Sequence, residues 1–446
     1  MIKVSLIAKT DEIPLNLVSH AAKTCYTSKV PEMGKLIDVE NNLFKTGHHT
    51  TFQHNFFTFN IDGLSISSAT FGLHLTHPFY NTDQRSGRFS KMYSNPDYGE
   101  IKEYILKYWD NTNIDDVMSF IQKGITIYQD NIEKATEIAE KFIKEERPNA
   151  NEDYIKMNAP KIAQEQMRVF ISTISPTALD YTINLSTLSA MYRSAWNPEL
   201  RNIVEQMKNL VLAQYPDLSY VFEEDKKKVD NWSPEMNFNN LEIKTNPTCK
   251  VLNIDFDDDI NLNLPTKDSV DLRYFSPDNM NNNISTIKTE IEVSIATMGQ
   301  DQRHRVIKRS KPKITGNFYL PPILKEMKLE QVALQFLQDY ADLLNKIDNT
   351  LLLTIAPYGL MVSYKKLSDL NGLMHEQEKR LCWSAQEEIY HISKSLYDYL
   401  IDNNYKDLAE KLTPACYKKC CIEGRRYCGR DINKLKTDKS IPNRKI

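Results

Sequence analysis

The strongest constraint on the fold is that one order of predicted elements occurs twice along the 446-residue chain. Each copy starts with an alternating, strand-like segment, continues into a second strand and ends in long helical segments. Residues 222–247 lie between the copies and are polar, charged and poor in aliphatic side chains, which is typical of a linker. We therefore expect a duplicated α+β fold with units at 1–221 and 248–446, each an antiparallel sheet flanked by helices, related by an approximate twofold axis.

Hydrophobic periodicity predicts the elements of each unit. In the first unit we expect strands at 2–7 and 52–61, a polar loop at 81–91, and helices at 15–25, 30–45, 65–76, 115–146 and 154–214. In the second unit we expect strands at 250–256 and 289–295, a basic loop at 303–313, and helices at 323–346, at 351–379 with a break at 357–359, and at 385–403.

Composition narrows the class of protein. Hydrophobic residues make up 41% and charged residues 26%, as in globular proteins, and the net charge of −3 predicts no general attraction to nucleic acid or anionic membranes. The first residues are too short an apolar run for a signal peptide, and no stretch approaches the ~20 apolar residues of a membrane helix. We expect a cytoplasmic protein, whose seven cysteines form no disulfide framework.

Three histidines lie close together in Gly47–His54, just before an aromatic segment. Imidazole is a common zinc ligand, so His48, His49 and His54 are candidates for a metal site. Strand geometry would spread them over two faces, however, and no cysteine or acidic partner lies nearby. The alternatives are structural histidines or a cofactor contact.

Two basic loops are candidates for binding anions. In Ser86-Gly87-Arg88 the glycine allows backbone N–H groups to approach a phosphate, which the arginine can bind with two donors; an ordinary solvated turn is the alternative. The second loop, 303–313, has seven basic side chains in eleven residues and follows Gln300. It could follow a nucleic-acid backbone or be a solvated loop.

Together these segments resemble the flavin-dependent thymidylate synthase (ThyX) family, whose signature is R-H-R followed by S-G-R-Y. Gln300 with Arg303-His304-Arg305 resembles the first part, and Ser86-Gly87-Arg88-Phe89 the second. The family also has a G-H-x-T-x-x-x-H motif before an aromatic strand. The resemblance implies FAD contacts from His48 and Thr50, with His54 completing the motif.

Each half lacks the part of the signature that the other half has. At the R-H-R spacing from Ser86 stands Thr76-His77-Pro78, and no Ser-Gly-Arg follows Arg305. The resemblance implies that 86–88 hold the phosphate and sugar of dUMP, and that Gln300, Arg303 and Arg305, with His304, serve FAD and the nucleotide. One composite site from both halves is expected, with the opposite combination empty.

A helical motif of the family occurs near the end of each half. In the second half Asn371, His375 and Arg380 precede Ala385-Gln386, and the resemblance implies flavin contacts for the first two and a uracil contact for Arg380. Asp369 and Asn371 stand where the family has Asn and Arg. In the first half the motif offers Arg168 for the substrate and Arg193 as the alternative uracil-side arginine, although Asn197-Pro198 interrupts it.

The tail, residues 411–446, contains Cys416, Cys420, Cys421 and Cys428. Four thiols could bind zinc, but the spacing has no C-x2-C pair, and several ThyX proteins end in a similar cysteine pattern. We assign no metal. The tail has eleven Lys/Arg against three Asp/Glu, so we expect a solvated or partner-facing extension.

The implied activity is reductive methylation of dUMP to dTMP with FAD, NADPH and methylenetetrahydrofolate, and with Ser86, Arg193 or Arg380 at the reacting pyrimidine. No cysteine stands in the ligand-binding motifs, so no thiol nucleophile is implied. Because ThyX enzymes are homotetramers, a two-unit chain is expected to form a homodimer. The rival predictions are a non-catalytic FAD- or nucleotide-binding paralogue and, with less support, a nucleic-acid-binding protein.

Overall fold

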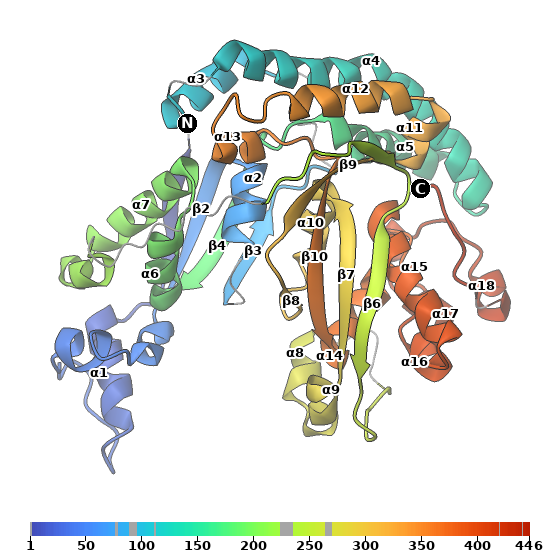
Figure 1. Cartoon of the computed structure of the whole chain (residues 1–446). Helices are drawn as coiled ribbons and strands as arrows, with labels where there is room; N and C mark the ends of the chain where they lie inside the picture. The colour runs from blue at the N-terminus through green and yellow to red at the C-terminus, as the bar shows by residue number, and fades with distance from the viewer. Residues whose placement is uncertain are drawn as a thin grey trace.

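The computed structural model describes residues 2–75, 79–88, 96–110, 113–223, 235–263, 270–418, 420–438 and 440–446. Two sheets stand side by side, and long helices from both halves lie across one end of them (Figure 1). The mixed class, with antiparallel sheets flanked by helices, is confirmed.

The first sheet has the strand order β1-β2-β4-β3, with every pair antiparallel. Its strands are β1 (Lys3–Lys9), β2 (Phe56–Ser65), β3 (Tyr80–Gln84) and β4 (Pro176–Asn184). Side chains alternate across β2, so Phe57, Phe59 and Ile61 point to one face and are buried. This alternation explains why the aromatic segment forms a strand.

The second sheet repeats this order as β6-β7-β10-β9, again with antiparallel pairs. Its strands are β5 (Glu242–Lys244), β6 (Thr248–Asp255), β7 (Thr286–Ser294), β8 (Lys308–Arg309), β9 (Lys313–Tyr319) and β10 (Leu360–Asp369). β8 pairs with β10, and β5 adds a parallel strand beside β9. β5 lies within the predicted linker 222–247, so that part of the segment belongs to the second sheet.

The same capping contact follows the second strand of each half. β2 leads into α2 (Ile66–Ser68) and β7 into α10 (Ile295–Asp301), with Ser65 and Ser294 as the N-cap residues. Each serine also donates its hydroxyl and its backbone N–H to a buried carboxylate, that of Glu199 in the first half and Glu388 in the second. These contacts connect each sheet to a late helix of its own half.

The two halves share one hydrophobic core. Ser172 bridges to Pro357, and the backbone N–H groups of Tyr358 and Gly359 donate to the first half at 2.9 Å each. Above the sheets α4 (Ile114–Glu146) packs on α12 (Glu330–Ala341), where Phe120 stacks on Phe336 with ring centroids 4.7 Å apart. The halves therefore form one packed body.

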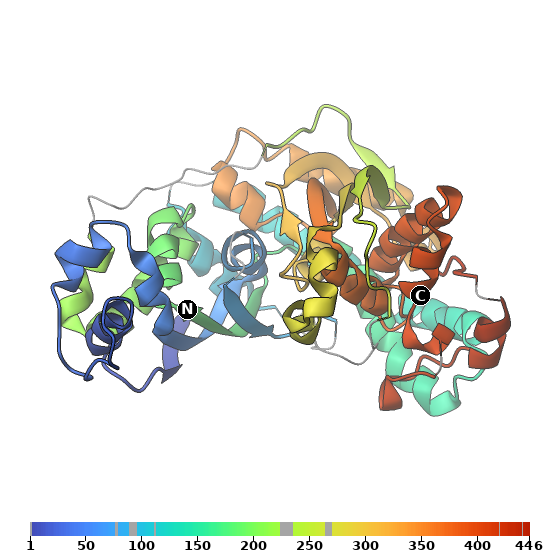
Figure 2. The same cartoon turned by 90° about the horizontal axis from the view of Figure 1, so that it is seen from below.

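The other elements cover the sheets and the two ends of the molecule. α1 and the segment after it lie at the opposite end from α15–α18 (Figures 1 and 2). The remaining helices are α1 (Pro14–Thr24), α3 (Tyr98–Tyr108), α5 (Glu152–Met167), α6 (Leu185–Ser194), α7 (Pro198–Leu212), α8 (Val270–Phe275), α9 (Met280–Ile284), α11 (Pro322–Glu326), α13 (Asn349–Thr354), α14 (Leu370–Arg380), α15 (Glu387–Asp402), α16 (Lys406–Lys411), α17 (Ala415–Lys418) and α18 (Ile432–Asp438). In the described part of the chain, no helix combines the length and apolar character needed to cross a membrane.

Several predicted elements were wrong. The expected helices 154–214 and 351–379 each contain a central strand, β4 and β10, because pairing with β2 and β7 outweighs local helical periodicity. The expected helix 30–45 forms only a short π-turn, η1 (Glu40–Phe44). The expected loop 81–91 begins as β3, and its residues 89–91 lie outside the described residues.

The tail was also predicted wrongly. It packs against both halves, with Arg430, Leu435, Ile441 and Arg444 buried. Two of these are cations whose side chains lie on aromatic rings and carbonyl groups of the core, so the basic composition does not make the tail a solvated extension.

Candidate functional site

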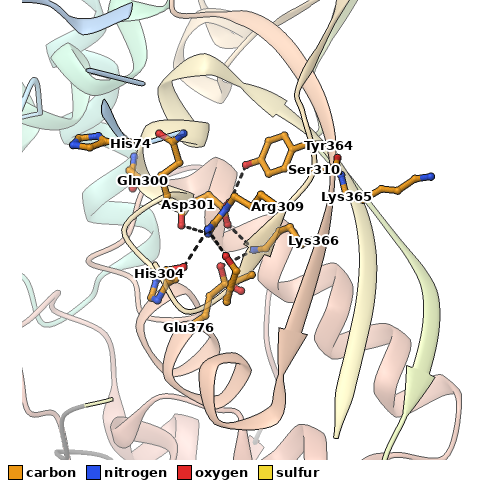
Figure 3. Close-up of polar contacts among 12 residues, drawn as sticks. His74, Gln300, Asp301, His304, Arg309, Ser310, Tyr364, Lys365, Lys366 and Glu376 are labelled. Carbon is orange, nitrogen blue, oxygen red and sulfur yellow. Dashed lines mark hydrogen bonds and ion pairs between the residues drawn. The ribbon is translucent and has the colours of Figure 1, made fainter. Parts of the chain in front are cut away.

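A buried ionic cluster holds the start of the basic loop (Figure 3). Asp301, at the end of α10, accepts hydrogen bonds from Arg309 Nε at 2.5 Å, Lys366 Nζ at 2.5 Å and the Tyr364 hydroxyl at 2.9 Å. Lys366 also contacts Glu376 Oε1 at 2.6 Å. Burial alone would raise the pKa of Asp301, but Arg309 and Lys366 outweigh it and hold this pKa well below its usual range. Two cations thus balance two carboxylates.

This cluster also fixes the backbone of the loop. Arg309 donates to the main-chain carbonyls of His304 at 3.1 Å and Ile307 at 2.9 Å, and to that of Asp301. The loop therefore curls around one guanidinium, and Arg303 and Arg305 lie on the part of the curl that faces the first half.

The basic loop contacts the first half along β3. Arg303 donates to Gln84 Oε1 at 2.9 Å, and Arg305 donates to Asn81 Oδ1 at 2.8 Å. The Arg305 guanidinium also lies over the Tyr80 ring, 5.5 Å from its centroid. β3 leads directly into residues 86–88, so the two separated parts of the signature come together across the two halves.

Arg88 also joins the two halves, through contacts on α5 and on the segment before α15. Its Nε donates to Glu165 on α5, and its Nη2 donates to the carbonyl of Ser384 at 3.1 Å. Gln164 donates to the carbonyl of Gly87 at 2.9 Å. The Arg88 backbone N–H donates to Ser86 Oγ at 3.3 Å, which makes a tight turn of the 86–88 segment.

Two glutamines connect the remaining predicted substrate residues. Gln386 Oε1 accepts from Gln300 Nε2 and from Arg168 Nη2, the latter at 3.2 Å. Arg380 Nη2 donates to the carbonyl of Gln300 at 2.6 Å. Burial lowers the pKa of Arg380 to about 10, and the nearby Arg88 adds to the lowering, so the side chain stays charged at neutral pH.

The structure thus brings together the predicted substrate residues Ser86, Gly87, Arg88, Arg168, Gln300, Arg303 and Arg380. Within the described residues, the buried atoms Arg168 Nε, Arg380 Nε and Gln300 Oε1 have no hydrogen-bond partner. Buried polar atoms are normally satisfied, so these three atoms are suited to bind a polar ligand.

Two histidines lie beside these predicted substrate residues. The rings of His304 and His375 lie 5.5 Å apart, and His304 Nε2 is buried without a partner among the described residues. Burial lowers the pKa of His375 to about 4, with Arg273, Lys379 and Arg380 adding to the effect, and burial holds that of His304 well below its usual range. Both rings are neutral at physiological pH and can offer a hydrogen bond without charge.

His74 is a residue that sequence reasoning missed. It stacks on Tyr80, with ring centroids 5.6 Å apart, and burial beside Arg303 and Arg305 lowers its pKa to about 3. Glu165 and Ser384 were also missed. Glu165 lies in a segment without a motif, and Ser384 contacts Arg88 through its backbone carbonyl, which no side-chain pattern records. Gln386 could have been found from the sequence, because it belongs to the Ala-Gln pair of the motif that follows Arg380.

The predicted flavin motif of the first half lies elsewhere. His48, Thr50 and His54 are exposed at the turn η2 (His49–His54), which precedes β2 rather than forming part of it. Across the described residues no hydrogen bond or ion pair joins 48–54 to 303–305.

Three other predicted segments also lie apart from the basic loop or outside the described residues. Arg193 lies near 48–54, over the Phe44 ring and beside a small cavity of about 80 Å³. Asn371 is buried, and its amide bonds to Asn279 and Asn283. Thr76-His77-Pro78 lies outside the described residues.

The cysteine cluster includes a residue that looked isolated in the sequence. Cys382 lines one cavity of about 20 Å³ together with Cys416, Cys421 and Cys428. Burial raises the pKa of Cys416 to about 12, so this thiol is protonated at neutral pH. Among the residues that the structure describes, no three His, Cys, Asp or Glu side chains are arranged to hold a metal ion.

Comparison with known families finds a match in the first half. The family model described as thymidylate synthase complementing protein matches residues 5–217. Residues 5–217 therefore match the thymidylate synthase complementing protein (ThyX) family.

Solved structures show weaker similarity. Thymidylate synthase X from Helicobacter pylori, solved with FAD and dUMP, is 17% identical, with a TM-score of 0.34; the match covers 51% of this chain and 100% of that one. A UMP/dUMP methylase, PolB from Streptomyces cacaoi, bound to 5-Br dUMP, is 13% identical, with a TM-score of 0.32, over 52% of this chain and 98% of that one. No curated protein sequence matches this chain.

Proposed function

We propose that this chain is a flavin-dependent thymidylate synthase that makes dTMP from dUMP, using methylenetetrahydrofolate and NADPH, at one site composed of both halves. The observation that carries the proposal is the convergence of Arg88 and Arg168 from the first half with Arg303 and Arg380 from the second, around Gln300. Grouped guanidinium charges favour the binding of an anion among them, and a nucleotide phosphate supplies that anion.

The roles of the substrate residues follow from their positions. Arg88 and the backbone of 86–88 would hold the phosphate, because the glycine lets the chain approach an anion beside a guanidinium. Arg380, buried and charged, would stabilise negative charge on the pyrimidine ring, and Gln300 Oε1 would accept a ring N–H. Glu165 now neutralises part of the Arg88 charge, so phosphate binding would require Arg88 to share or exchange this partner.

The basic loop fits the flavin cofactor. Arg303 and Arg305 present two cations for a pyrophosphate, and the neutral His304 and His375 offer ring nitrogens for hydrogen bonds. When bound and reduced by NADPH, FAD would supply the hydride, and methylenetetrahydrofolate would supply the one-carbon unit. The residues of the chain bind and orient these groups and exclude water. Burial raises the pKa of the nearby Cys382 thiol, which agrees with a mechanism without a cysteine nucleophile.

We further propose that the chain arose by tandem duplication and works as a homodimer. The repeated strand order and the paired serine–glutamate contacts support the duplication. Because His48, Thr50, His54 and Arg193 lie away from loop 303–305 within one chain, a second copy would have to bring them to the flavin. The domain division at 222–247 remains part of this proposal.

A second candidate is a FAD- and nucleotide-binding paralogue without activity. It is favoured by the same separation of 48–54 from 303–305, since a flavin held only by the second half would lack the contacts of the first. Turnover separates the two candidates.

The test is production of dTMP. The purified chain with FAD, NADPH, methylenetetrahydrofolate and dUMP should form dTMP, and the gene should support growth of a thymidine-requiring bacterial strain without thymidine. Bound flavin with no dTMP in either assay would favour the paralogue, and absence of both flavin and dUMP binding would reject both candidates.

A further inference from the structure

The last segment of the tail, residues 440–446, lies beside the candidate site and buries Ile441, Arg444 and Ile446. The backbone N–H of Lys445 donates to Glu146 at 2.8 Å, and its carbonyl accepts from Gln166 at 2.8 Å. The carbonyl of Pro442 accepts from the Tyr390 hydroxyl at 2.5 Å. Side chains of α4, α5 and α15 thus hold this segment in place.

Arg444 of this segment bonds through both of its terminal nitrogens to the backbone that precedes α15. Only 3% of the residue is exposed, its guanidinium lies 4.5 Å from the centroid of the Tyr390 ring, and it donates to the carbonyls of Trp383 at 2.8 Å and Ala385 at 2.5 Å. A buried guanidinium with two carbonyl acceptors fixes both peptide groups, because leaving either unpaired is costly.

The residues between and after these two carbonyls reach the candidate site. The carbonyl of Ser384 accepts from Arg88, and the side chain of Gln386 accepts from Arg168 and Gln300. Residues 383–386 therefore bond in alternation to Arg444 and to residues of the candidate site. The carbonyls of 383 and 385 meet Arg444, and 384 and 386 meet the residues that would bind the nucleotide.

We propose that Arg444 is a positioning residue for the nucleotide site. It would hold residues 383–386 so that Ser384 and Gln386 orient Arg88, Arg168 and Gln300, without touching the nucleotide itself. This inference rests on the proposed function, since it assigns dUMP to that site. It also gives the tail a role that its sequence does not suggest.

The test compares two buried arginines of the same tail. Arg444→Lys keeps the charge but not two donors in fixed geometry, and Arg444→Ala leaves a space that free guanidinium ion can enter. Arg430→Lys is the matched control, because Arg430 is also buried but lies on the Trp383 ring, 3.8 Å from its centroid, and donates to the Tyr417 hydroxyl. For each protein we would measure dUMP affinity by equilibrium dialysis, flavin content, and amide hydrogen exchange in peptides covering 381–390.

We expect Arg444→Lys to weaken dUMP binding about 10- to 100-fold with unchanged flavin content, as misplaced binding groups do. Guanidinium ion should restore affinity to Arg444→Ala, and Arg430→Lys should bind dUMP as the wild type does. Wild-type affinity in Arg444→Lys, or an equal loss in Arg430→Lys, would overturn the proposal.

Failure of the proposed function gives a different result. If the wild-type chain does not bind dUMP, the function is wrong, and hydrogen exchange alone decides the role of Arg444. Faster exchange in 381–390 of Arg444→Lys, relative to Arg430→Lys, would then support its positioning of this segment, and unchanged exchange would reject it.

Discussion

Arg88 of the first half donates a hydrogen bond to the carbonyl of Ser384 in the second half, at 3.1 Å. The contact spans nearly three hundred residues of sequence and links the Ser-Gly-Arg turn to the segment after Arg380. Because Arg88 also pairs with the buried Glu165, one guanidinium connects three separate parts of the chain at the candidate site.

Replacement of Arg88 should remove most of the dUMP affinity. Arg88→Ala is expected to cost about 2–5 kcal/mol of binding free energy, since it removes the phosphate partner and leaves Glu165 buried and unpaired. Titration calorimetry with dUMP would measure the loss. Arg85→Ala is the control, because Arg85 is exposed and lies 3.6 Å from Asp62. Equal dUMP affinity in wild type and Arg88→Ala would refute the assignment.

The candidate site was predictable where the chemistry needs residues close together in sequence. Ser86-Gly87-Arg88 and Arg303-His304-Arg305 carry their signal in three consecutive residues, because a turn or loop presents them to one phosphate. Arg380 was predicted from its spacing to Ala385-Gln386 in the helical motif.

The rest depended on contacts that no local pattern records. Asp301 meets Lys366 through the pairing of β10 in the sheet, and β10 itself was mistaken for helix since Lys365 and Lys366 interrupt its apolar alternation. Arg444 reaches Trp383 only because the tail folds back, which its basic composition argued against.

Flavin binding should depend on the basic loop. The double variant Arg303→Ala/Arg305→Ala is expected to purify without flavin colour, because both cations proposed for the pyrophosphate are lost. Absorbance near the flavin band, relative to protein, measures this. Lys313→Ala is the control, as Lys313 is exposed on β9 and pairs with Glu235 at 2.7 Å. Unchanged flavin content in the double variant would mean that FAD binds elsewhere.

The buried ion cluster predicts a large difference between two adjacent lysines. Lys366→Met leaves Asp301 and Glu376 buried without their shared cation, so the free energy of unfolding should fall by about 3–5 kcal/mol. Lys365 points away from the cluster on the other face of β10 (Figure 3), and Lys365→Met should change stability by less than about 0.5 kcal/mol. Urea unfolding of both variants tests the cluster, and similar losses would argue against it.

Glu387 should make stability depend on pH. Burial raises its pKa to about 8, with Glu165 and Glu388 adding to the effect, so the native state keeps a proton that the unfolded chain releases above about pH 4.5. The contribution of Glu387 to the free energy of unfolding is fully present below about pH 4.5 and is lost as the pH rises to about 8. Glu387→Gln should therefore be more stable than wild type at pH 8, on the order of a few kcal/mol, and similar at pH 4.5. Urea unfolding at both pH values, with the exposed Glu103→Gln as control, would show this; parallel pH profiles for Glu387→Gln and wild type would contradict it.

The number of nucleotide sites per chain tests the composite arrangement most directly. The second half offers no Ser-Gly-Arg after Arg305, and Thr76 stands where the first half would need a cation, so the opposite combination of halves lacks both phosphate-binding parts. Saturation binding of dUMP should therefore give one nucleotide per chain. Arg88→Ala and Arg303→Ala should each reduce this same site, because one residue from each half is needed. Two nucleotides per chain, or loss of only half the binding in either variant, would mean that each half kept a site of its own.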